Sequence, residues 1–172
     1  MSQRQPEVWM RGAVPGYPAL LQPVVHSLLQ SLEEVQAHVP DLTAEALWTR
    51  RNGAASVGYH VRHAAGSLDR LLTYARGEML SPAQLSALRS EGESDMEPGA
   101  TRRLVEGFAG AVDRALEQIR HTNESSLLEP RGVGRAQLPS TVIGLLCHSA
   151  EHTQRHIGQM VTTIKISASA AL

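Results

Sequence analysis

Three histidines recur at four-residue intervals toward the C-terminal end of the chain. They are His148, His152 and His156 in the stretch CHSAEHTQRHIGQM, and a second pair, His60 and His63, lies upstream in YHVRH. Residues four apart on an α-helix project from the same face, one turn from each other. His152 and His156 can therefore bind one transition-metal ion, with a third ligand, either His60 or His63, from a facing helix.

A structural role is the alternative interpretation of these histidines. A single His-x-x-x-His pair on a helix is a weak signal, and such residues are more often surface or half-buried side chains with ordinary hydrogen bonds. The third histidine of the stripe and the second pair upstream strengthen the metal interpretation. They leave the structural one open.

Other polar residues near the candidate ligands could hydrogen-bond to the ligand imidazoles without binding the metal themselves. His60 and His148 each lie one turn from a candidate ligand, where they could hydrogen-bond it or relay protons, although a satisfied core or surface histidine is the simpler role. Glu151 and Asp69 could orient a ligand imidazole or be ordinary solvated charges. Gln159 is a further candidate for such a supporting contact.

Helix is the strongest periodic signal in the segments that must position these residues. Apolar residues at three- and four-residue steps predict long helices over residues 23–39, 54–77, from about 101 to 119, and from 139 to about 164. Shorter helices are expected at 43–48, with Thr43 as N-cap, and from 81, where Ser81 precedes a proline. Residues 123–139 are expected to form a loop that can begin with a turn of helix, and no strand pattern competes with the helices.

These segments predict an all-α fold, a four-helix bundle with a long connection between its second and third helices. The length fits one domain over residues 1–172, with about 1–15 and 167–172 extended or frayed.

Composition narrows the classes of function. The chain has 16 Lys and Arg against 17 Asp and Glu, so its net charge of −1 does not favour binding to nucleic acid. The single cysteine, Cys147, excludes an intrachain disulfide. A buried structural role is expected for it, with a thiolate metal ligand as the alternative. Neither a signal peptide nor an apolar run long enough to span a membrane is present, so we expect a soluble cytoplasmic protein.

The stretches VGYHVRHAAGSLDRLLTYARGE and CHSAEHTQRHIGQM resemble the two signature helices of the DinB-like superfamily, also called YfiT-like metalloenzymes. The resemblance covers nearly the whole chain. The family's last signature, His-x-x-x-His followed by Gly-Gln, is matched by His152, His156 and the pair Gly158–Gln159. Its earlier signature, one histidine before small residues, is matched by His63.

The resemblance implies that His63, His152 and His156 hold a divalent cation, most often zinc or nickel, with manganese or iron as alternatives. The chain departs from the family at two places. Ile157 stands where an arginine often precedes the Gly-Gln pair, and Gly66 and Leu68 stand where many members carry an acidic residue. These departures concern the surroundings of the ion and the substrate pocket.

Three classes of function remain open. A bound cation could activate a thiol, and the resemblance implies a thiol-dependent S-transferase or isomerase that uses a low-molecular-weight thiol and a small-molecule substrate. It could instead activate water for hydrolysis, although the sequence offers no clear general base. A non-catalytic role, as a metal-binding or stress-response protein or as a helical module without metal, is the third. The resemblance also implies a homodimer.

Overall fold

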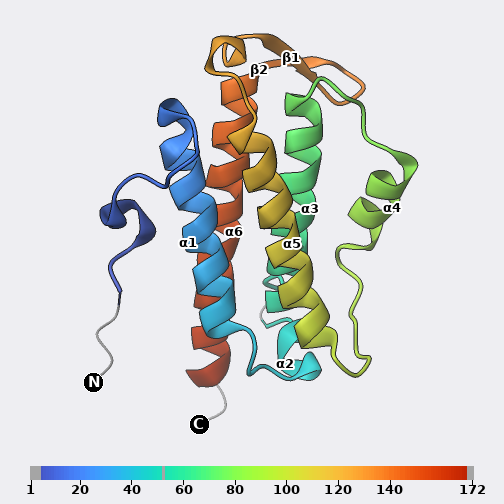
Figure 1. The fold of residues 1–172 in the computed structure, drawn as a ribbon. Helices are drawn as coiled ribbons and strands as arrows, with labels where there is room; N and C mark the ends of the chain where they lie inside the picture. Colours follow the sequence, from blue (N-terminus) through green and yellow to red (C-terminus); the bar gives the residue numbers. More distant parts are fainter. Residues whose placement is uncertain (1–4, 52, 170–172) are drawn as a thin grey trace.

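The structure is a computed structural model that describes residues 5–51 and 53–169, and its core is a bundle of four long helices (Figure 1). These helices are α1 (Gln22–His38), α3 (Val57–Ala75), α5 (Ala100–Arg120) and α6 (Val142–Ser169). Helices α3 and α5 run in the same direction, antiparallel to α1 and α6. The chain between α3 and α5 must therefore return along the outside of the bundle, which confirms the predicted long connection.

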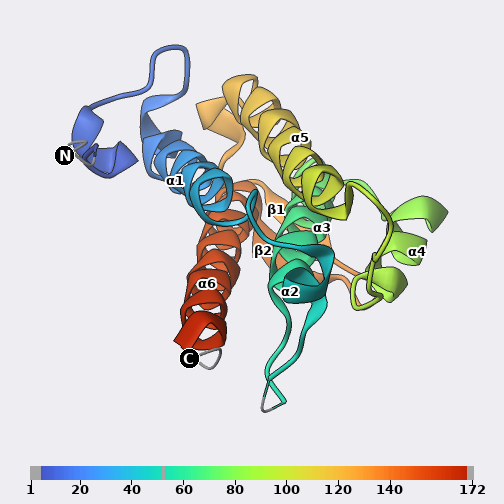
Figure 2. The same cartoon turned by 90° about the horizontal axis from the view of Figure 1, so that it is seen from below.

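Shorter elements close the ends of the bundle and lie along its side (Figures 1 and 2). They are the 3-10 helices η1 (Val8–Arg11), η2 (Ala19–Leu21) and η3 (Glu124–Ser126), the helices α2 (Ala44–Trp48) and α4 (Pro82–Ser90), and the strands β1 (Pro130–Val133) and β2 (Leu138–Thr141). Within the described residues, no helix is both long and apolar enough to cross a membrane.

Local sequence signals account for where the helices begin and end. The Ser56 side chain accepts a hydrogen bond from the Tyr59 amide and caps α3, and Gly77, at φ 80°, lies just beyond its end. Thr43 caps α2 as predicted. Helix α4 begins at the predicted Ser81, where the Ser81 and Gln84 side chains form a reciprocal capping box.

The β1–β2 hairpin corrects the loop predicted over residues 123–139. The two four-residue strands pair antiparallel, and Val133 faces Leu138 next to the turn. Neither strand has an alternating apolar pattern, because the hairpin lies at the bundle end with much of it exposed. The strand continues to Thr141, so α6 begins at Val142 rather than at residue 139.

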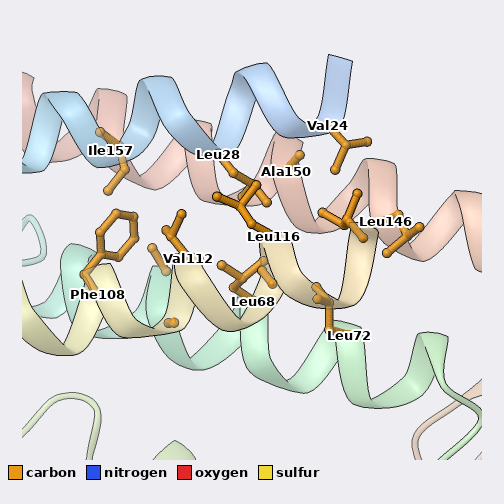
Figure 3. Close-up of a cluster of buried hydrophobic side chains, with 14 of the residues drawn as sticks. Val24, Leu28, Leu68, Leu72, Phe108, Val112, Leu116, Leu146, Ala150 and Ile157 are labelled. Carbon is orange, nitrogen blue, oxygen red and sulfur yellow. The ribbon is translucent and has the colours of Figure 1, made fainter. Parts of the chain in front are cut away.

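The inward faces of the four long helices form one continuous core (Figure 3). Phe108 of α5 and Leu68 of α3 are each 1% exposed within it. Trp48 of α2 packs on α3 at Gly58, where an added Cβ would lie 2.9 Å from the indole ring. The small residues of α3 therefore allow close packing, as expected from the sequence.

The chain ends differ in part from the extended segments expected for residues 1–15 and 167–172. Within the described residues, Val8–Arg11 form η1, and α6 continues to Ser169. The Val8 amide donates to the Gln30 side chain, which ties η1 to α1. The expectation for residues 1–4 and 170–172 lies outside the described residues.

Candidate metal centre

Helices α3 and α6 bring the two distant histidine clusters together. Across the interface of these helices, Nε2 of His63 lies 3.0 Å from Nε2 of His152. Ser149 and Thr153 of α6 are fully buried, and their hydroxyls bond to carbonyls of the preceding turn of α6. These small side chains with satisfied hydroxyls let α6 pack closely inside the bundle, where the histidines of α3 and α6 meet.

His63, His152 and His156 form a compact triad. Each offers one ring nitrogen, and the three nitrogens all lie within 4.8 Å of one another. The ring centroid of His156 is 4.5 Å from that of His63 and 4.6 Å from that of His152. All three side chains are half-buried.

The spacing and chemistry of the triad fit a divalent transition-metal ion. Two nitrogens that bind one zinc ion at about 2.0–2.1 Å lie roughly 3.4 Å apart at a tetrahedral angle and roughly 2.9 Å apart at a right angle. The 3.0 Å between the Nε2 atoms of His63 and His152 falls in this interval. Three imidazoles are also a ligand set that zinc and nickel accept while keeping further coordination positions open.

Glu91, the residue after α4, contacts the triad and was not anticipated from the sequence. Its Oε2 lies 2.7 Å from Nδ1 of His63, and its Oε1 accepts a hydrogen bond from Nη1 of Arg70 at 2.5 Å. Glu91 is 4% exposed. It is 28 residues from His63 in sequence, at the end of the separate short helix α4, so no local pattern connects it to the histidines.

Two α3 side chains complete the surroundings of the triad. His60 is buried, and its Nδ1 lies 3.1 Å from Nδ1 of His156. Tyr59 stacks on the ring of His63, with centroids 5.3 Å apart and an interplanar angle of 11°. Among the candidates for a supporting contact, the structure places His60 directly against the triad.

The other candidates for supporting contacts lie toward the α6 surface. His148 is about half exposed, its ring centroid lies 5.5 Å from that of His152, and it pairs with Glu151 at 3.3 Å. Glu151 also forms an ion pair with Arg155 at 2.5 Å, so its carboxylate serves the α6 surface rather than a triad imidazole. Gln159 is exposed.

Asp69 and Cys147 also differ from their sequence-based interpretations. The carboxylate of Asp69 accepts a hydrogen bond from the Gln84 side chain at 2.7 Å and so joins α3 to α4 instead of orienting a ligand. The prediction of a buried cysteine was wrong, because Cys147 is exposed. It precedes His148 on α6 and faces away from the core.

The electrostatic environment favours neutral imidazoles. Burial, followed by the positive forms of His63 and His152, lowers the pKa of His156 to about 4. Burial and His63 also lower the pKa values of His60 and His152. A neutral imidazole keeps the lone pair that a metal needs.

The carboxylate of Glu91 stays ionised in the same surroundings. Burial raises the pKa of Glu91, but the hydrogen bonds from His63 and Arg70 outweigh that effect and the net shift is downward. A buried negative charge therefore lies beside His63.

Comparison with known proteins gives the chain a family context. Residues 27–160 match the family model described as the DinB superfamily. The crystal structure of a DinB-like protein from Bacillus cereus ATCC 10987 is similar, with a TM-score of 0.59 and 16% identity over 84% of this chain and 91% of that one. At this identity the similarity shows a shared fold. No curated protein matches the chain.

Proposed function

Because the chain belongs to the DinB superfamily, we propose that it is a metal-dependent enzyme whose His63, His152 and His156 bind one divalent cation. Zinc and nickel suit the three imidazoles best, and manganese and iron are the alternatives. The observation that carries the proposal is the 3.0 Å approach of the His63 and His152 Nε2 atoms across two helices. Two neutral imidazoles whose nitrogens face each other at this distance are stabilised when one cation binds both lone pairs.

The reaction that we propose is transfer of a low-molecular-weight thiol to a small-molecule substrate. A divalent cation in the triad would supply the Lewis acidity that ionises a thiol at neutral pH. The half-exposed His148 and the exposed Glu151–Arg155 pair lie on the α6 surface beside His152. We expect substrates to approach the triad from this side.

Hydrolysis is the weaker candidate because it calls for a carboxylate free to accept a proton from water. Among residues 5–51 and 53–169, the carboxylate in direct contact with the triad is that of Glu91. Its two oxygens are already engaged by His63 and Arg70. A thiol is far more acidic than water, so a bound cation would ionise it at neutral pH with its proton released to bulk solvent.

Cobalt(II) substitution tests the proposed chemistry directly. Protein stripped of metal and reloaded with cobalt(II) should show visible absorption, and added cysteine or glutathione should produce a new sulfur-to-cobalt charge-transfer band. His121→Ala, which changes an exposed histidine on the far end of α5, is the matched control and should behave like the parent. Cobalt binding without any response to thiols would exclude the thiol reaction and leave hydrolysis or a non-catalytic metal-binding role.

The proposed assembly is a homodimer. Light scattering that gave a single species of 18.6 kDa would contradict it.

A further inference from the structure

The segment that follows α4 reaches the histidine triad through one side chain. Helix α4 itself buries none of its residues. Glu91, which comes directly after it, is 4% exposed, and its carboxylate bridges His63 and Arg70. A charged side chain is buried in this way only where its hydrogen bonds offset the loss of hydration.

We propose that Glu91 is a positioning residue for His63, and that it couples docking of the α4 segment to metal binding. The proposal rests on the proposed function, in which His63 is a metal ligand. The ionised carboxylate can only accept, so Nδ1 of His63 carries the proton and donates it to Oε2 at 2.7 Å. Nε2 then keeps its lone pair, and this is the atom that faces His152.

Arg70 and Gly66 hold the Glu91 carboxylate in place. Arg70, 9% exposed, supplies the compensating positive charge through its 2.5 Å hydrogen bond to Oε1. Gly66 supplies the space, since a Cβ at this position would overlap both Oε1 of Glu91 and the Arg70 guanidinium. The carboxylate therefore occupies a site on α3 that was built from a glycine, an arginine and a histidine.

Coupling follows from the polar contacts that hold the α4 segment to α3. The Gln84 side chain at the start of α4 donates to Asp69 and Thr73. The Arg62 guanidinium donates to the carbonyls of Ser90 and Glu93. Glu91 adds the contact that reaches the triad. A cation on Nε2 of His63 strengthens the donor at Nδ1, so loading the site should hold residues 82–93 more tightly against α3.

The test compares the parent chain with Glu91→Gln, and with Asp69→Asn as a matched control that weakens another α3–α4 contact without touching a histidine. Zinc affinity is measured by competition with a chromophoric chelator. Glu91→Gln should bind zinc about 10–100-fold more weakly, as is usual for loss of a carboxylate behind a ligand histidine. Asp69→Asn should stay close to the parent. The double variant Glu91→Gln with Arg70→Gln, which leaves no unpaired buried charge, should show the same loss if the single variant folds poorly.

The second measurement needs no metal. Long-range ¹H–¹⁵N spectra of the metal-free parent should show His63 with its proton on Nδ1, and this preference should be lost in Glu91→Gln but kept in Asp69→Asn. Zinc should slow amide exchange over residues 82–93 in the parent and not in Glu91→Gln. Unchanged zinc affinity and an unchanged His63 tautomer in Glu91→Gln would overturn the proposal. If the parent binds no metal, the proposed function fails, while the tautomer still decides the role of Glu91.

Discussion

His63 and His152 are 89 residues apart in the sequence, yet their Nε2 atoms lie 3.0 Å apart across the α3–α6 interface. Two neutral imidazoles in this arrangement can share at most one proton between these atoms. A divalent cation would satisfy both lone pairs and that of His156 together. Nδ1 of His152, on the opposite side of its ring, is buried without a hydrogen-bond partner among the described residues. The helix interface therefore holds polar groups at a cost, and metal binding would offset the part that arises between the facing Nε2 atoms.

The metal-free protein should lose stability as the pH falls from about 6.5 toward 5. The pKa values of His60, His152 and His156 are lowered in the folded state, that of His156 to about 4, so the unfolded chain binds more protons in this range. Above the unfolded histidine pKa of about 6.5 these three residues cost the folded state no stability, and below it the free energy of unfolding declines. Urea unfolding of chelator-treated protein at several pH values measures the slope.

His156→Gln is the variant that isolates this effect, because it removes the histidine whose surroundings lower its pKa to about 4. Its unfolding free energy should depend less on pH between 5 and 6.5 than that of the parent. The surface control His121→Ala should keep the slope of the parent, since its ring lies on the exposed end of α5. Equal slopes in the parent and in His156→Gln would contradict the account of the histidine environment.

Gly66→Ala should destabilise the protein and weaken metal binding together. The new Cβ would overlap the Glu91 carboxylate and the Arg70 guanidinium, and overpacking of this kind costs about 1–3 kcal/mol. Chemical denaturation and chelator competition measure the two effects.

Gly107→Ala is the matched control for this substitution. An added Cβ at Gly107, in the middle of α5, meets nothing within 4 Å. Alanine at such a helical position should be neutral or stabilise the fold by about 0.4–1 kcal/mol, and zinc affinity should not change. A Gly66→Ala protein that matched this control in both measurements would show that Glu91 is not tightly held.

Removal of the metal should leave the bundle folded. The apolar core runs along all four long helices, with Leu28, Leu68, Phe108 and Leu146 at 1% exposure or less, and it does not depend on the triad. Chelation should therefore lower the midpoint of thermal unfolding while the far-ultraviolet circular dichroism keeps its helical form. Loss of the helical spectrum on chelation would instead identify a metal site that the fold requires.

The helical part of the fold could be predicted because its signals are local. Apolar periodicity marked the long helices, and Thr43 and Ser81 marked two helix starts that the structure confirms. The hairpin was missed because four-residue strands at the end of a bundle bury too little to show a period-two pattern. The burial of Cys147 was misjudged because its position next to the histidine stripe did not fix which way it faces on α6.

In the candidate site, too, only the residues with a local sequence signal could be predicted. Four-residue spacing placed His152 and His156 on one face of a helix, and the resemblance selected His63 as their partner. Glu91 could not be found in this way, because its contact with His63 depends on the path of the α4 segment over α3. The role of Gly66, which leaves room for the Glu91 carboxylate, also depends on that path and could not be predicted from the sequence.

Elemental analysis of protein purified without a histidine tag, beside His63→Ala, His152→Ala and His156→Ala, decides whether the triad binds a metal. We expect close to one equivalent of zinc or nickel per chain in the parent, its loss in all three variants, and its retention in the control His121→Ala. A parent that holds no metal and takes up neither zinc, nickel, manganese nor iron would rule out the proposed metal centre. The triad would then be a structural feature of the α3–α6 interface.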